Sequence, residues 1–176
     1  MTELSNSQLT EILVSQNAAL QALIQKKMPK SILKEVKPNV TIEEFIENIE
    51  LINIEKLLHC KLPVYYANVI IHNLEKLAAK DHPMVCTDAK QKKFYYFSNG
   101  EWLIDKKFIR DIKSKIFHLV LDQIILKRQI SQGNLETQMC MSIFFDVEKY
   151  PAEKLLDKIQ VELGKLMPSI NDLEFE

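Results

Sequence analysis

The residues most able to do chemistry in this chain are its histidines and cysteines, but their spacing does not match that of a zinc site. His59 and Cys60 are adjacent, His82 and Cys86 are four residues apart, and His72 lies between the pairs. A structural zinc site needs two ligand pairs at conventional spacing, and Pro83 interrupts the only candidate pair. We expect no metal ligands and no cofactor, with Cys60 and Cys86 packing as small apolar side chains.

Nucleophilic and general acid or base chemistry are no better specified. A cysteine and histidine pair is formally available, but no activating glycine turn places the two together. The acidic run of Glu43, Glu44, Glu47 and Glu50 has helical spacing and reads as a solvated face. The chain has only three glycines, which are far apart, so it contains no phosphate-binding glycine loop. We therefore expect no catalytic residues and no enzyme.

The charged residues suggest one binding surface. Residues 88–115 contain eight basic and four acidic residues, whereas residues 134–176 contain four lysines and nine acids. The basic side chains could contact nucleic-acid phosphates, next to a hairpin bearing Tyr95, Tyr96 and Trp102. The alternative is that they solubilise a helix or pair with the acidic C-terminal region. The candidate contacts are Lys90, Lys92, Lys93, Lys106, Lys107, Arg110 and Lys113.

The N-terminal segment carries a second candidate surface, for self-association. Leu9, Leu13, Leu20 and Leu23 occupy heptad core positions, with Gln16 in the intervening slot. A seam of under three heptads is marginal alone, so this helix needs a partner, and a polar residue in the seam would set its register. The alternative is that the helix packs on its own domain. We expect residues 1–28 to form a helix of coiled-coil type and residues 29–40, with two prolines, to form a linker.

Two helices are predicted next. Thr41 and Glu44 have the spacing of a capping box, which starts a helix predicted from Ile42 to about Leu58. Its inward face would be Phe45, Ile46, Ile49, Ile52 and Lys56. Pro63 suits the first turn of a second helix, Val64 to about Ala79, with a buried stripe of Ala67, Ile70, Ile71, Leu74 and Leu77.

The pattern then changes to that of strands. Met84–Thr87 and Lys93–Phe97 have strand character, and Asn99-Gly100 is the sequence typical of a tight hairpin turn, so Phe94–Ser98 should pair with Glu101–Ile104. A long helix should start at Asp105 and end near Arg128. Its inward side chains would be Phe108, Ile109, Ile112, Ile116, Leu119, Val120 and Gln123.

The C-terminal third reads as further helix. Gly133 should break the long helix, residues 135–147 favour a helix, and Pro151 should open a last amphipathic helix through Leu166, before an acidic tail. The expected fold is mainly α (α+β), a helical domain with a small antiparallel β-hairpin in a winged-helix-like arrangement. We divide it into a helical core at 41–130 and a C-terminal helical region at 131–176.

Composition limits the setting. The formal net charge is -1, so no field of the whole chain drives binding to nucleic acid or membranes. Three widely spaced cysteines suit reduced thiols inside a cell. The N-terminus has no basic flank before an apolar run, and no run of 18 apolar residues occurs, so we expect neither a secretory signal nor a membrane span.

Three segments carry a family resemblance: NVTIEEFIENIEL (Asn39–Leu51), VIIHNLEKL (Val69–Leu77) and HPMVCTDAKQKKFYYFSNGEWLID (His82–Asp105). Through them, residues 38–115 resemble a module of coiled-coil proteins from nucleocytoplasmic large DNA viruses of the giant-virus type. In the last block the matching residues are Pro83, Cys86, Thr87, Asp88, Lys90, Tyr95, Trp102 and Asp105, whereas Val85 and Gln91 replace the family's His and Arg.

The resemblance implies a viral protein without established chemistry. Such proteins often have a coiled coil upstream, which agrees with the Leu9–Leu23 seam, and some carry an N-terminal zinc finger, which this chain lacks. We expect a non-enzymatic structural or interaction protein that forms a homo-oligomer or binds another viral protein. Its place would be the cytoplasm or nucleus of the infected cell, or the virion.

Overall fold

The computed structural model describes residues 33, 35–88, 93–131, 134–146 and 151–167. The chain divides into two compact units, Met1–Val36 and Lys37–Glu176, and the elements below belong to the second unit. Several predictions lie outside the described residues: the N-terminal helix with Leu9, Leu13, Gln16, Leu20 and Leu23, the contacts Lys90 and Lys92, the helix break at Gly133, and the tail from Pro168.

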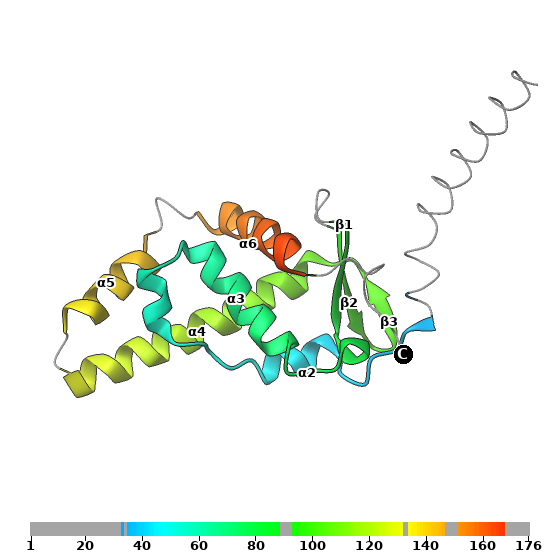
Figure 1. Cartoon of the computed structure of the whole chain (residues 1–176), viewed down its shortest axis with the longest axis horizontal. Coiled ribbons are helices and arrows are strands. Elements are labelled where there is room, and N and C mark those ends of the chain that lie inside the picture. Colours follow the sequence, from blue (N-terminus) through cyan, green and yellow to red (C-terminus); the bar gives the residue numbers. More distant parts are fainter. Residues whose placement is uncertain (1–32, 34, 89–92, 132–133, 147–150, 168–176) are drawn as a thin grey trace, which may run out of the picture. The chain divides into compact units, whose positions relative to one another are not determined.

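The fold is mainly helical, with one small antiparallel sheet, as predicted (Figure 1). The elements follow in the order α2 (Ile42–Glu47), η1 (Ile54–Leu58), α3 (Leu62–Leu74), η2 (Ala79–Asp81), β1 (Met84–Asp88), β2 (Lys93–Ser98), β3 (Glu101–Leu103), α4 (Lys106–Ser131), α5 (Leu135–Phe144) and α6 (Ala152–Leu166), where η marks a 3-10 helix.

The predicted helix from Ile42 to Leu58 is wrong, because α2 stops at Glu47 and η1 begins only at Ile54. The capping box does form, with Glu44 N donating to Thr41 Oγ1 and Thr41 N donating to Glu44 Oε2. The side chain of Asn48 then donates to the carbonyl of Glu44 and ends the helix, and Asn53 caps η1. Asparagine competes in this way for backbone groups that a continuing helix would use.

A buried asparagine binds the backbone of the segment between α2 and η1. Asn73 of α3, 6% exposed, accepts from Glu50 N at 3.0 Å and donates to Glu50 O at 2.8 Å. It also donates to Val69 O, one turn back in its own helix. The side chain therefore replaces the partners that Glu50 would have in a helix, and α3 itself ends at Leu74, earlier than predicted.

The sheet is a meander in the order β1-β2-β3. The predicted hairpin turn is confirmed, since Asn99 and Gly100 both have positive φ, 51° and 80°, and Ser98 pairs with Glu101. Tyr96 faces the helices and packs on Phe108 of α4 with ring centroids 5.4 Å apart. Thus β1 joins the hairpin as a third strand, and α4 follows the sheet directly.

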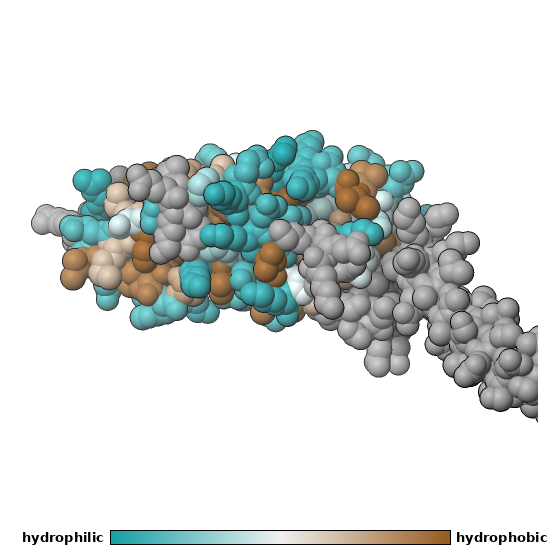
Figure 2. All heavy atoms as spheres, turned by 90° about the horizontal axis from the view of Figure 1, so that it is seen from above, coloured by the Kyte–Doolittle hydropathy of each residue, from teal (hydrophilic) through white to brown (hydrophobic). Residues whose placement is uncertain are grey.

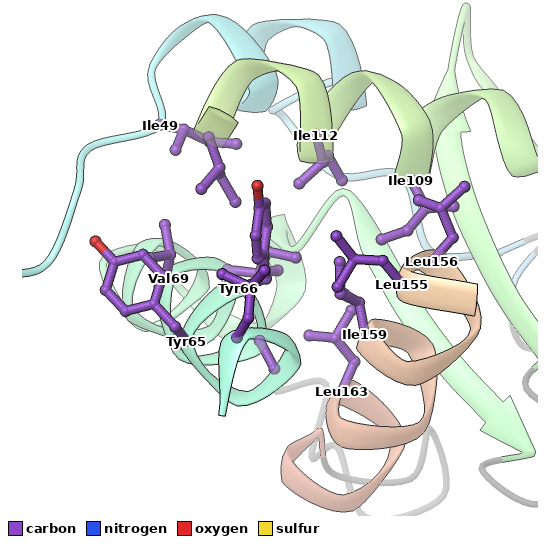
Figure 3. Close-up of a cluster of buried hydrophobic side chains, with 14 of the residues drawn as sticks. Ile49, Tyr65, Tyr66, Val69, Ile109, Ile112, Leu155, Leu156, Ile159 and Leu163 are labelled. Carbon is purple, nitrogen blue, oxygen red and sulfur yellow. The ribbon is translucent and has the colours of Figure 1, made fainter. Parts of the chain in front are cut away.

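The core lies where α3, α4 and α6 meet. Side chains from these helices, among them Tyr66, Ile112, Leu155 and Ile159, point toward one another (Figure 3). Asp105 Oδ1 accepts from Lys107 N at the start of α4. The inward face of α4 is as predicted except at its end, where Gln123 is exposed and Ile124 is buried.

The helices of the predicted C-terminal region pack on the rest of the compact unit: α6 packs chiefly on α3, and α5 packs on η1 and α4. The end of the predicted linker 29–40 belongs to the compact unit, since the backbone and side chain of Asn39 both donate to Asp81 Oδ1. None of the described helices is both long and apolar enough to cross a membrane.

Candidate functional surfaces

The described basic candidates lie on β2 and on α4. Lys93 is exposed at the start of β2, and Lys106 is exposed at the start of α4. Lys106, Arg110 and Lys113 follow at helical spacing along α4, with Lys107 beside them. We call these five side chains, Lys93, Lys106, Lys107, Arg110 and Lys113, the basic end.

The basic end is open to solvent. Its side chains are exposed, apart from the half-buried Lys113. Ion pairs in the described part of the chain include Lys76 with Glu50, Lys127 with Glu55 and Lys165 with Glu162, and the basic end takes part in none of these three. The nearest acids along α4 are Asp105, which caps the helix, and Asp111.

The aromatic residues of the hairpin do not add stacking faces to this surface. Tyr95 and Tyr96 are buried, and Trp102 packs on Phe97 with centroids 5.4 Å apart. These rings stabilise the sheet, so the basic end offers charge without the free aromatic faces that bind unpaired bases.

A groove lies between the junction of η1 with α3 and the C-terminal end of α5. Residues 57–62 line one side, and Ser142, Ile143 and Asp146 line the other, around a volume of about 370 Å³. His59, Cys60 and Asp146 thus meet in one depression, which the sequence did not predict because Asp146 lies far from Cys60 along the chain. We call it the η1–α5 groove.

The thiols are not arranged for nucleophilic attack. Cys60 Sγ donates to Lys56 O at 3.2 Å, and burial raises the pKa of this thiol, so it stays protonated at neutral pH. Burial likewise raises the pKa of Cys140, whose Sγ donates to Ile54 O at 3.8 Å. The Cys60 thiol thus bonds back to η1 within the same segment, and the Cys140 thiol joins α5 to η1.

The remaining histidines and cysteine that were weighed as metal ligands do not lie together. His72 is exposed on α3, His82 ends η2 half-buried, and Cys86 is buried in β1. Burial lowers the pKa of His82. In the part of the chain that the structure describes, no three His, Cys, Asp or Glu side chains come together in a way that could hold a metal ion.

Beside the groove, α5 exposes an apolar stripe. Leu135 and Met139 are 71% and 48% exposed, and with Ile143, which lines the groove, they recur every four residues along one helix face. We call Leu135, Met139 and Ile143 the α5 stripe. Further apolar side chains are exposed nearby, Ile125 and Leu126 on α4 and Phe145 after α5, and hydrophobic residues gather on this end of the molecule in Figure 2.

Aromatic packing fixes the position of α5 from behind. Phe144 stacks on Phe117 of α4 at 5.1 Å and lies parallel to Tyr66 of α3 at 6.5 Å. Asn134 caps α5 by accepting from Thr137 N. The α5 stripe is therefore the outer face of a firmly seated helix, and sequence periodicity missed it because the buried and exposed faces of α5 are both apolar.

Comparison with protein families, curated proteins and solved structures finds no match to this chain.

Proposed function

We propose that the protein is a non-enzymatic interaction protein that self-associates through its N-terminal helix. The observation that carries this proposal is the exposed α5 stripe, where Leu135 is 71% and Met139 48% exposed beside an open groove. Contiguous exposed apolar surface rimmed by polar residues marks sites of protein association. The heptad seam of Leu9, Leu13, Leu20 and Leu23 supplies an apolar helix face on the same chain.

The chemistry of the groove supports a binding role over a catalytic one. A cysteine nucleophile needs a lowered pKa, whereas burial raises that of Cys60 and its proton is held by a backbone carbonyl. Besides Cys60, the groove is lined by apolar Leu57, Leu58, Leu62 and Ile143 and by polar His59, Lys61, Ser142 and Asp146. This mixed lining suits an amphipathic protein segment.

The resemblance of residues 38–115 to a module of giant-virus proteins supports a viral origin as part of this proposal. It would place the protein in the cytoplasm or nucleus of an infected cell, or in the virion, as a structural component or a partner of another viral protein.

Molar mass by light scattering tests the self-association. The full chain should exceed the 20.5 kDa of a single copy, and a chain starting at Pro29 should not. Monomers in both samples would refute the proposal.

A second candidate function, nucleic-acid binding, rests on the basic end. Its five cations lie at the start of β2 and in the first turns of α4, the helix that follows the hairpin. The succession of helices, hairpin and helix is compatible with the winged-helix-like arrangement expected from the sequence. Phosphate contacts by lysine and arginine release counterions, which makes binding depend steeply on salt.

Replacement of Lys106, Arg110 and Lys113 by Glu tests this function. Duplex DNA should bind the wild type at 50 mM salt, and the triple variant should bind more weakly, with a salt slope smaller by about one for each phosphate that it no longer binds. Glu at the exposed Lys37, Lys80 and Lys154 is the charge-matched control and should change little. Absence of binding by the wild type at 50 mM salt excludes the function.

A further inference from the structure

The α5 stripe and the η1–α5 groove form one continuous surface that the described part of the compact unit leaves uncovered. Ile143 belongs to both, and Met139 and Leu135 extend the surface away from the groove along α5. The groove lining is mixed, with Leu57, Leu58, Leu62 and Ile143 beside the polar His59, Lys61, Ser142 and Asp146. An amphipathic helix binds a groove of this kind through side chains at positions i, i+4, i+7 and i+11.

The N-terminal segment has the matching pattern. Leu9, Leu13, Leu20 and Leu23, with Gln16 between them, follow that spacing, and the stripe they form would span about 21 Å as a helix. The ten residues of α5 span about 15 Å, and the groove extends the surface beyond its end. The lengths of the two apolar surfaces are therefore comparable.

Charge sets a direction for the contact. The N-terminal segment is acidic at its beginning, at Glu3 and Glu11, and basic at its end, at Lys26 and Lys27. The charges along the α5 stripe and groove run in the opposite order. Exposed Lys61 and His59 lie near the C-terminal end of α5, and exposed Glu136 lies in its first turn. Asp146 also lines the groove and offsets part of this charge. An antiparallel arrangement of the docked helix against α5 brings opposite charges together.

We propose that the N-terminal helix of one copy docks on the α5 stripe and η1–α5 groove of a second copy. This inference rests on the proposed self-association and names the surface that the N-terminal helix binds. That surface is the α5 stripe with its groove, and not the N-terminal helix of the second copy. A seam of under three heptads gives two such helices little area to bury against each other. The α5 stripe with its groove provides a preformed surface on a packed unit.

Mixing two full-length variants tests the assignment. One, the helix variant, carries Leu13→Glu and Leu20→Glu, and the other, the stripe variant, carries Leu135→Glu and Met139→Glu. Each should be monomeric alone in sedimentation velocity, with Kd raised more than about tenfold. The mixture should form a heterodimer, because the intact helix of the stripe variant can still enter the intact groove of the helix variant.

A matched control replaces apolar side chains exposed elsewhere. Ile104→Glu with Val161→Glu changes an exposed residue between β3 and α4 and one on α6, and this variant should associate like the wild type. Circular dichroism checks that each variant is folded, and a Leu135→Ser, Met139→Ser pair repeats the comparison if the Glu pair unfolds.

The other outcomes are distinguishable. If the helix variant is monomeric but the stripe variant still associates, this inference is overturned. The proposed self-association would then occur by pairing between N-terminal helices. Two monomeric variants whose mixture stays monomeric also overturn it, since a helix and a groove on different chains would then not meet. A monomeric wild type refutes the proposed function and this inference with it.

Discussion

At the scale of single residues, Asn73 decides the course of the chain before α3. Its amide makes three hydrogen bonds, two to the backbone of Glu50 and one to Val69 O. A buried polar group left without its partner costs far more than an average hydrogen bond contributes. Sequence periodicity could not show this, because a lone asparagine within an apolar helix carries no signal of the distant backbone that it binds.

We predict that Asn73→Ala lowers the free energy of unfolding by about 2–3 kcal/mol, because it strands the backbone groups of Glu50. Urea denaturation followed by circular dichroism measures the change. Asn48→Ala, which removes one exposed side-chain bond to Glu44 O, is the control and should cost under about 1 kcal/mol. Equal effects of the two substitutions would contradict the role given to Asn73.

Among the helices, strands and turns, those features that depend on interactions between residues close in the sequence were predicted correctly. The Thr41 and Glu44 capping box, the Asn99-Gly100 turn, and the start of α4 after Asp105 all form as predicted. The break after Glu47 and the burial of Ile124 in place of Gln123 depend on contacts with other elements. The basic end was partly predictable from spacing on α4, whereas the η1–α5 groove needs residues 57–62 and 142–146 to meet in space.

The capping box makes α2 sensitive to acid. The backbone and side-chain hydrogen bonds of Thr41 lower the pKa of Glu44 in the folded state. A carboxyl whose folded pKa is depressed contributes stability above its unfolded pKa, and this is lost as pH falls through the folded value. We predict that Glu44→Gln reduces the loss of stability between about pH 6 and pH 3, measured by urea midpoints.

The control for this prediction is Glu47→Gln, an exposed carboxyl on the same helix. It removes the same charge without touching the capping box. If it changes the pH dependence as much as Glu44→Gln does, the effect reflects net charge and the capping box is not its source.

At the scale of the whole molecule, the packing of α6 on α3 makes residues from Lys37 on one compact unit. Ile159 is fully buried in that contact. We predict that Ile159→Ala destabilises the protein by about 2–5 kcal/mol. The midpoints reported by Trp102 fluorescence and by helical circular dichroism should shift together, because the sheet and α6 unfold cooperatively.

Val161→Ala, on the exposed side of α6, is the control and should shift neither midpoint by much. Separate transitions in the Ile159→Ala variant, with the fluorescence midpoint unchanged, would show that α6 is independent of the sheet.

If the N-terminal helix joins copies of this protein, as we propose, sedimentation equilibrium of the full chain over a range of concentrations will detect the association. The average mass of the wild type should rise above 20.5 kDa with concentration, while the Leu13→Glu, Leu20→Glu variant should stay at that value throughout. A wild type that remains at 20.5 kDa at every concentration, or a variant that associates as strongly as the wild type, would contradict the claim.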